Sequence, residues 1–362
     1  MLPIDTNTLT RASFCARGPL SDLLLTALDG PLTPGQALLT DFETAVAAAI
    51  DCSGFVMVDD DLQLTLFVLY GLHYGGVVPG DEKWEWHPST IAARILIENA
   101  LEAQLRHSVA QPPLPAPTRD TVARALFVLT CNDQGPSLAR YLSRQATREQ
   151  AIEFVVHRSV YTLKEADPHS WAIPRLTGRA KAALIEIQAD EYGGGDVERM
   201  HSVLFASTMR GLGLDDRYAA YVDSVPAITL ASFNTMSMFG LNRRLRGALV
   251  GHLAAFEMTS AIPSRLYADG FQRLGFESDV TRYFDEHVEA DAVHEQIAGR
   301  DLAGSLAEDD PALLGDIMFG ASVCLTMDGL VADHMLGRWK DDLSSLRFPA
   351  VGVAHLSAVA AP

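Results

Sequence analysis

The sequence contains only four cysteines, and they lie far apart. They are Cys15, Cys52, Cys131 and Cys324, and no C-x-x-C pair occurs. Paired thiols at short spacing would be needed for a thiolate metal cluster or a redox motif. The wide spacing instead indicates reduced, mostly buried thiols, which are typical of a cytoplasmic protein.

Long apolar runs and an excess of basic residues are also missing. No run has the length needed to cross a bilayer, so we expect no membrane partner. The first residues lack the basic and apolar regions of a signal peptide. Lys and Arg number 28 against 46 Asp and Glu, which gives a formal net charge of −18. No basic stripe offsets this charge, which argues against nucleic acid as a partner.

The alternation of apolar and polar residues that predicts strands is essentially absent. Apolar residues recur instead with helical spacing, almost without interruption after the proline-rich segment 111–117. We therefore predict an all-α fold. Residues 1–117 would form an N-terminal helical extension that ends in the proline-rich linker, and residues 118–362 would form a helical bundle.

The helices can be placed from spacing, capping residues and breakers. Residues 1–35 contain two Gly-Pro pairs and are expected to be a loose lead-in. Ser89 is a candidate N-cap, and Thr147 with Gln150 forms a capping box. Helical spacing begins at residue 35, and the clearest helices are predicted at residues 62–72, 89–107, 119–131, 136–145, 147–166, 178–192, 196–212, 226–239, 245–262, 264–274, 279–299 and 312–339.

One predicted helix carries a stripe of metal-ligand residues. His287, Asp291 and His294 are spaced i, i+4 and i+7, which places them on one helix face. Two imidazoles and a carboxylate on one face form half of a metal site. The alternative is a polar helix that happens to contain two histidines. Matching ligands elsewhere in the chain would favour the metal site.

Three residues can complete such a site. Glu165 and Glu191 each lie near the end of a predicted helix, and His201 follows ten residues after Glu191. Ten residues of unbroken helix span roughly 15 Å, too far for one metal cluster. The three glycines at 193–195 permit unwinding, which would return His201 toward Glu191. Alternatively, the glycines form a simple turn and His201 is a surface or core residue.

The resulting ligand set is mixed, with three histidines and three carboxylates. It excludes a structural zinc site, which would favour thiolates. It suits two iron or manganese ions bridged by carboxylates between the helices of a bundle. Such a site indicates redox chemistry more than hydrolysis, although dinuclear hydrolases have overlapping ligands.

The sequence resembles the heme-oxygenase-like diiron oxidases and oxygenases, often described as iron-containing redox enzymes. Their third core helix carries H-x-x-x-D-x-x-H, which His287, Asp291 and His294 match. Glu165 and Glu191 match the glutamates of their first and second core helices. Members that oxygenate amine nitrogen have a further histidine at the position of His201. The resemblance covers residues 147–339 and leaves the N-terminal part unexplained.

This resemblance implies a heme-oxygenase-like bundle that holds two Fe ions, which cycle between Fe2+ and Fe3+, with O2 as co-substrate. It implies N-oxygenation of a small amine in specialised metabolism. The alternatives are oxidative decarboxylation or desaturation of a small amino or fatty acid, or a binding module without catalysis. The expected partners are a small-molecule substrate, with an external electron donor and a second copy of the chain as further candidates.

Several polar residues are weaker candidates for supporting roles. His169, Glu186, His252 and Glu257 could orient the ligands or could be satisfied structural groups. Arg243, in the basic cluster 243–246, could hold a substrate carboxylate through its guanidinium. The alternative for this cluster is pairing with nearby acids at the surface.

Overall fold

The computed structural model describes residues 14–29, 40–75, 77–78, 80–131 and 137–348, without the side chains of 40 and 289–293. Within these residues every regular element is a helix, and no strand occurs. The all-α prediction is therefore confirmed, with the arrangement expected of a heme-oxygenase-like bundle.

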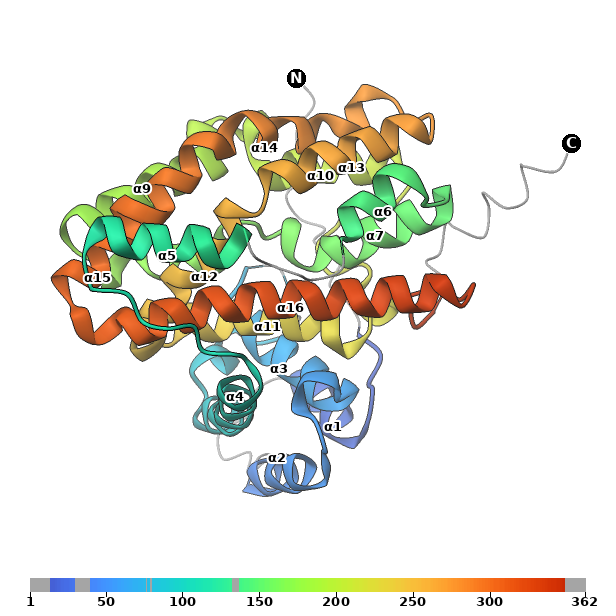
Figure 1. Ribbon diagram of the computed structural model, residues 1–362. Helices are drawn as coiled ribbons and strands as arrows, with labels where there is room; N and C mark the ends of the chain where they lie inside the picture. Colours follow the sequence, from blue (N-terminus) through green and yellow to red (C-terminus); the bar gives the residue numbers. More distant parts are fainter. Residues whose placement is uncertain (1–13, 30–39, 76, 79, 132–136, 349–362) are drawn as a thin grey trace, which may run out of the picture.

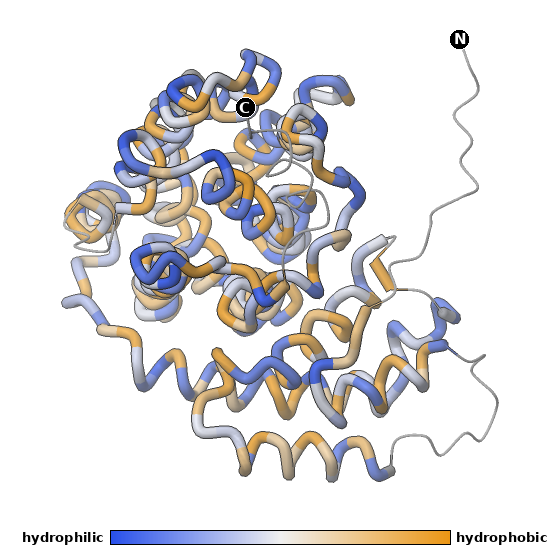
Figure 2. The backbone as a smooth tube through the Cα atoms, turned by 90° about the vertical axis from the view of Figure 1, so that its right-hand side faces the viewer, coloured by the Kyte–Doolittle hydropathy of each residue, from blue (hydrophilic) through white to orange (hydrophobic). Residues whose placement is uncertain are grey.

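The N-terminal helices form a group on one side of the bundle. Figure 1 shows them beneath α11 and α16, and Figure 2 shows apolar and polar segments alternating along them. The predicted boundary near residue 117 stays a prediction. The group comprises α1 (Pro19–Asp29), α2 (Thr40–Cys52), α3 (Asp60–Gly71) and α4 (Pro88–Ser108).

The remaining helices form the bundle that contains the predicted ligands. They are α5 (Arg119–Cys131), α6 (Leu138–Arg144), α7 (Arg148–Thr162), α8 (Asp167–Ser170), α9 (Gly178–Glu191), α10 (His201–Gly211), α11 (Ala227–Leu241), α12 (Arg246–Met258), α13 (Ala261–Arg273), α14 (Ser278–Gln296), the π-helix η8 (Ile297–Gly304), α15 (Ser305–Asp309) and α16 (Leu314–Lys340). Short 3-10 turns join several of these helices.

Several helix boundaries were predicted well, and others need correction. Helix α5 has the predicted bounds, and the capping box of Thr147 and Gln150 is present. Helix α1 lies within the segment expected to be loose, because its apolar residues form a buried stripe. The N-cap of α4 is His87 rather than Ser89, with Pro88 in the first turn. The predicted helix 245–262 is divided between α12 and α13.

Two helices of the bundle approach each other at glycines. A Cβ on Gly251 of α12 would lie 1.8 Å from the carbonyl oxygen of Ile317, and one on Gly320 of α16 would lie 1.9 Å from that of Ala248. No larger residue fits either position without separating the helices. This contact fixes the position of α12, which carries Glu257.

One apolar segment among the described residues is long enough to span a membrane, and it consists mostly of helix α16. The prediction that no run reaches this length is therefore wrong for residues Pro311–Lys340, which meet the criteria of length and composition. However, 56% of the relevant window is buried by other parts of the protein. Its apolar side chains face neighbouring helices, as expected for the core helix of a bundle.

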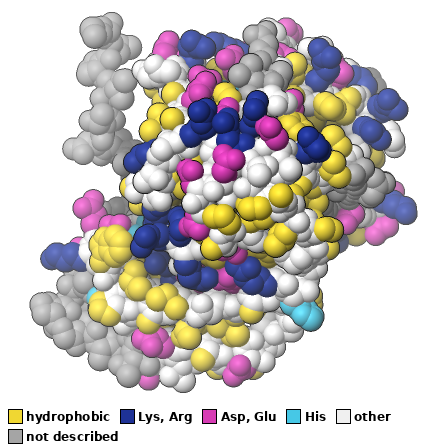
Figure 3. All heavy atoms as spheres, turned by 60° about the vertical axis from the view of Figure 1, so that its left-hand side comes forward, with side chains coloured by type: hydrophobic (Ala, Val, Ile, Leu, Met, Phe, Trp, Pro, Cys, Tyr) yellow, Lys and Arg dark blue, Asp and Glu magenta, His cyan; other side chains and the backbone are white. Residues whose placement is uncertain are grey.

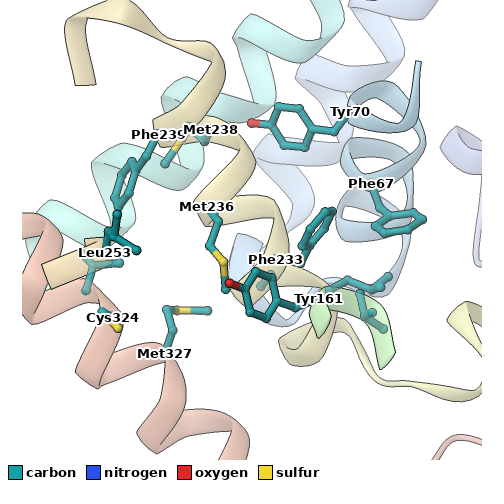
Figure 4. Packing of buried hydrophobic residues seen from close by; sticks show 14 of the residues in the cluster. Phe67, Tyr70, Tyr161, Phe233, Met236, Met238, Phe239, Leu253, Cys324 and Met327 are labelled. Carbon is teal, nitrogen blue, oxygen red and sulfur yellow. The ribbon is translucent and has the colours of Figure 1, made fainter. Parts of the chain in front are cut away.

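Helix α11 connects the N-terminal helices to the bundle. The rings of Phe67 on α3 and Phe233 on α11 have centroids 5.8 Å apart, and both are buried (Figure 4). The buried amide of Asn234 donates to the backbone oxygen of Gln63 at 2.9 Å and to its side-chain oxygen at 2.8 Å. These contacts fix α11, which also contributes to the wall of a cavity described below.

The exposure of the cysteines differs from the prediction. Cys15, Cys52 and Cys131 are exposed and only Cys324 is buried, so the prediction of mostly buried thiols is wrong. All four are free of disulfides. On the face shown in Figure 3, basic side chains lie interspersed with acidic ones.

Candidate metal centre

Four of the predicted ligands meet in the centre of the bundle. Glu165 lies in the turn after α7, Glu191 ends α9, His201 begins α10, and His287 lies on α14. All four side chains are buried. One donor atom from each lies within 4.8 Å of the others. This is the separation expected of side chains that share a metal ion.

The glycine segment brings His201 back to Glu191. Gly193, Gly194 and Gly195 have φ angles of +66°, +63° and +90°, which glycine adopts readily. The helix unwinds there into 3-10 turns, so α10 begins at His201 and the predicted start at residue 196 is wrong. As a result, Nδ1 of His201 lies 2.8 Å from Oε2 of Glu191. The expected unwinding is confirmed.

A second group of donors adjoins the first. Donor atoms of Glu191, Glu257 and His294 also lie within 4.8 Å of one another, and all three side chains are buried. Glu257 was expected only in a supporting role, yet its Oε2 lies 3.4 Å from Nδ1 of His294. Glu191 belongs to both groups. The arrangement therefore offers two neighbouring sites that share one carboxylate.

Several of these atoms have no hydrogen-bond partner. They are Oε2 of Glu191, Nδ1 of His201 and Nδ1 of His294. The contact between Glu191 and His201 is short, but its angles do not satisfy a hydrogen bond. Leaving buried polar atoms unpaired costs free energy, and a bound ion would satisfy them. The donor set therefore fits a pair of metal ions with N and O preference.

The helices that carry these ligands resemble those of a known family. Residues 152–329 match the family described as iron-containing redox enzymes. This region of the chain is therefore similar to that family, and the match confirms the resemblance inferred from the motifs. The buried Glu and His donors are consistent with iron as the metal.

A curated relative supports the same assignment. The chain is 30% identical over 165 residues to nitrosourea synthase of Streptomyces achromogenes subsp. streptozoticus. The match covers 45% of this chain and 35% of the relative, so the chain spans about a third of the relative's length.

Tyr283 orients two of the candidate ligands. Its hydroxyl lies 2.8 Å from each oxygen of the Glu165 carboxylate, to which it donates. Its backbone oxygen accepts from Nδ1 of His287 at 2.8 Å. The other ring nitrogen, Nε2, then lies 3.9 Å from Oε1 of Glu165 and is free to bind an ion.

Asp190 orients a third ligand. Its carboxylate accepts from Nε2 of His294 at 2.9 Å. The Nδ1 of His294 is therefore the nitrogen directed toward Glu257. Hydrogen bonds from ligating histidines to carboxylates fix both the tautomer and the ring orientation.

Burial and mutual charge shift the pKa values of these groups in the metal-free protein. Burial, with the neighbouring Glu191, raises the pKa of Glu165 to about 8, and burial lowers that of His287 to about 4. Burial opposes the charge on His201 and His294, but their carboxylate partners prevail and raise both pKa values to about 9. Protons therefore occupy the centre near neutral pH, and metal must displace them.

Of the other residues predicted for the site, some lie beside the ligands and some do not. His169 is buried beside Glu165 and Glu191, and its Nε2 lies 3.3 Å from Nδ1 of His252. Glu186 is exposed on the outer face of α9, so the structure does not bring it to the centre. The side chain of Asp291 lies outside the described residues, although α14 places its backbone one turn from His287.

Arg243 also lies away from the centre. It is exposed in the 3-10 turn η7 (Arg243–Leu245) and lines neither cavity near the ligands. Its neighbours form ion pairs, Arg244 with Glu102 at 2.5 Å and Arg246 with Asp310 at 3.1 Å. This basic cluster thus follows the alternative of surface pairing.

Two cavities adjoin the ligands. A small one of about 10 Å³ is bounded by Glu165, Glu191, Glu257 and His287. A larger one of about 580 Å³ reaches Glu165 and His287 from the side of α11, α13 and α16. Tyr161, Phe233 and Met236, shown in Figure 4, are among the apolar side chains of its mixed lining. Pockets of this size and character accommodate small organic molecules.

Proposed function

We propose that the chain is a non-haem diiron oxygenase that uses O2 to oxidise the nitrogen of a small amine. The observation that carries this proposal is the position of His201, which joins Glu165, Glu191 and His287 through the unwound glycine segment. The similarity to an enzyme named nitrosourea synthase supports nitrogen as the oxidised atom.

Six described residues would hold two iron ions. Glu165, His201 and His287 would bind one, Glu257 and His294 the other, and Glu191 would be shared, as the two groups of donors suggest. The iron held by these residues would supply two electrons for O2 reduction. With two protons from solvent, one oxygen atom would enter an N–H bond of the substrate and the other would leave as water. An external electron donor would then restore the ferrous state, and a cytoplasmic location would provide one.

The larger cavity suits the substrate. Its walls combine apolar and polar side chains, and Glu165 and His287 form part of its lining. An amine in this cavity would therefore approach the ligands of one metal position directly. Tyr283, which also lines the cavity, keeps the Glu165 carboxylate in place through its hydroxyl.

The test is anaerobic reconstitution with ferrous iron, followed by exposure to O2 in the presence of candidate amines. We expect about two bound iron ions per chain, O2 consumption and a hydroxylated nitrogen in the product. Products of decarboxylation or desaturation alone would refute N-oxygenation but retain the diiron centre. A protein that binds only traces of iron and consumes no O2 would instead be a binding module.

His201→Ala separates the role of this histidine from that of the fold. The variant should lose at least one iron or the N-oxygenated product while keeping its helical circular dichroism. His107→Ala, at an exposed position on α4, serves as the control and should retain both. Unchanged products in His201→Ala would remove the observation on which the proposal rests.

A further inference from the structure

The small cavity beside the ligands is lined by two buried polar side chains that the candidate metal centre does not use. Gln188 lies on α9, three residues before Glu191, and His169 lies on α8. Their exposed fractions are 3% and 1%. Neither residue belongs to the two groups of donors that fit a pair of ions. Their polar atoms therefore pair with other parts of the protein or bind a molecule in the cavity.

Each of the two side chains has one nitrogen without a hydrogen-bond partner among the described residues. These atoms are Nε2 of Gln188 and Nδ1 of His169. The amide nitrogen carries two N–H donors, and a ring nitrogen can donate or accept. Unpaired polar atoms in the interior cost free energy, so they are usually bonded to protein or to ordered water. Because both residues line one cavity, one bound molecule can serve both.

The orientation of the Gln188 amide follows from the contacts of its oxygen. That oxygen accepts a long hydrogen bond of 3.4 Å from the Ser170 hydroxyl. The Ser170 hydroxyl also lies 3.1 Å from that of Tyr192, which donates to the Asp167 carboxylate at 2.7 Å. These three partners do not line the small cavity. The amide oxygen is thus directed toward Ser170, and Nε2 is left for the cavity.

The ring of His169 is held by a second histidine. Its Nε2 lies 3.3 Å from Nδ1 of His252, and one of these two nitrogens carries the shared proton. Burial and the neighbouring His252 lower the pKa of His169 well below its usual value, so the ring is neutral. Its Nδ1 is then an acceptor if Nε2 donates, and a donor if Nε2 accepts. A molecule that both donates and accepts, such as water, suits either arrangement.

The cavity has room for one molecule of this size. Its volume of about 10 Å³ is close to the minimum that a single water requires. Buried waters typically make about three hydrogen bonds. Gln188 and His169 offer two, and Oε2 of Glu191, which lines the same cavity without a hydrogen-bond partner, offers a third. An organic substrate does not fit here, in contrast to the cavity of about 580 Å³.

We propose that the small cavity binds one water-sized oxygen ligand, which Gln188 and His169 hold in place against the metal centre. In the metal-free protein this ligand is water. In the iron-loaded protein the N–H groups of Gln188 stabilise negative charge that develops on an oxygen atom in the cavity. Only this last role rests on the proposed function, because binding of a water-sized ligand requires neither O2 nor an amine.

Crystallography of the metal-free protein gives the first test. We expect electron density for one water within hydrogen-bonding distance of Nε2 of Gln188 and Nδ1 of His169. Gln188→Met keeps the length of the side chain but removes the donors, so this variant should lose the water. Ser260→Ala is the matched control and should keep it. Ser260 lines the same cavity, but its hydroxyl already donates to the backbone oxygen of Glu257 at 2.9 Å.

Fluoride binding to the oxidised, iron-loaded protein gives the second test. Fluoride is similar in size to water and accepts hydrogen bonds, and its binding to ferric iron is followed by optical spectroscopy. Gln188→Met should weaken fluoride binding by about 10- to 100-fold, as expected for lost hydrogen bonds to a charged group. Its iron content and circular dichroism should match those of the wild type, which separates this role from a structural one. Ser260→Ala should bind fluoride normally.

Either of two results would overturn the proposal. One is a wild-type crystal without density between Gln188 and His169, and the other is a Gln188→Met variant that binds fluoride as tightly as the wild type. If the protein bound iron and fluoride but oxidised no amine, the proposed function would fail and the ligand site would stand. If it bound no iron, the diiron function would fail, and crystals of the metal-free protein would still decide the ligand site.

Discussion

Nδ1 of His201 lies 2.8 Å from Oε2 of Glu191, although ten residues separate them in the sequence. Their approach depends on the backbone of Gly193. With φ of +66°, a Cβ at this position would lie 2.7 Å from backbone atoms of both Arg199 and Met200. The chain therefore passes too close to itself here for any side chain.

Gly193→Ala should separate His201 from Glu191. We expect a loss of about 2–3 kcal/mol in the free energy of unfolding, because the left-handed backbone cost adds to the steric contact. Iron content should fall from two ions toward one. Urea unfolding and metal analysis measure the two effects.

Gly194→Ala is the matched control. Its φ is +63°, but no atom lies within 4 Å of the added Cβ. The variant should lose only about 1–2 kcal/mol in the free energy of unfolding, and it should retain both iron ions. Equal effects of the two substitutions would show that backbone strain alone, and not the close approach, governs this segment.

Tyr283→Phe should shift iron binding to higher pH. The hydrogen bond from the hydroxyl stabilises the charged form of Glu165, against the burial that raises its pKa to about 8. Without it, Glu165 holds its proton more tightly and yields it to metal less readily. A hydrogen bond of ordinary strength corresponds to a shift of at most about one pH unit.

The measurement for Tyr283→Phe is the midpoint pH of anaerobic ferrous binding. Tyr221→Phe is the control, since its hydroxyl contacts the backbone of Asp215 instead. An unchanged midpoint in Tyr283→Phe would mean that this hydrogen bond does not control Glu165.

Much of the fold and site could be predicted because their determinants are local. The helical spacing placed α5, and the stripe of His287 and His294 identified one side of the centre. The sequence indicated only a supporting role for Glu257, because its distance from His294 depends on how α12 packs on α16. Gly251 and Gly320 bring the backbones of these two helices together. No spacing along the chain reveals such an approach.

The metal-free protein should become less stable as the pH rises from about 6.5 to 9. The folded-state pKa values of His201 and His294 are raised to about 9, so their stabilising contribution is complete below 6.5 and disappears through 9. Glu165, with a pKa raised to about 8, also binds its proton more tightly when folded and acts in the same direction.

Below pH 6.5 the sign reverses for His287. Its pKa is lowered to about 4, so protonation favours the unfolded chain as the pH falls through this range. Thermal unfolding of chelator-treated protein across pH 5 to 9 measures both effects. Anaerobic ferrous iron should remove the decline at high pH, because metal then replaces the protons. A Tm of the metal-free protein that rises up to pH 9 would contradict the assigned protonation.

His294→Ala should remove one iron at little cost to the fold. The ring is held between Asp190 and Glu257, at 2.9 Å and 3.4 Å, and so serves the metal position more than the packing of helices. Iron analysis and circular dichroism should show one ion lost and the helical signal retained. Two ions in the variant would exclude His294 as a ligand.

Asp190→Ala should weaken the same metal position without abolishing it. Asp190 would bind no ion itself but fixes the His294 ring through Nε2, and loss of such a partner typically lowers metal affinity by about 10- to 100-fold. The carboxylate is largely exposed, so unfolding should change little. Glu186→Ala, an exposed acid on the same helix, controls for the lost charge and should bind both ions normally. If the two variants bind iron equally well, Asp190 does not position His294.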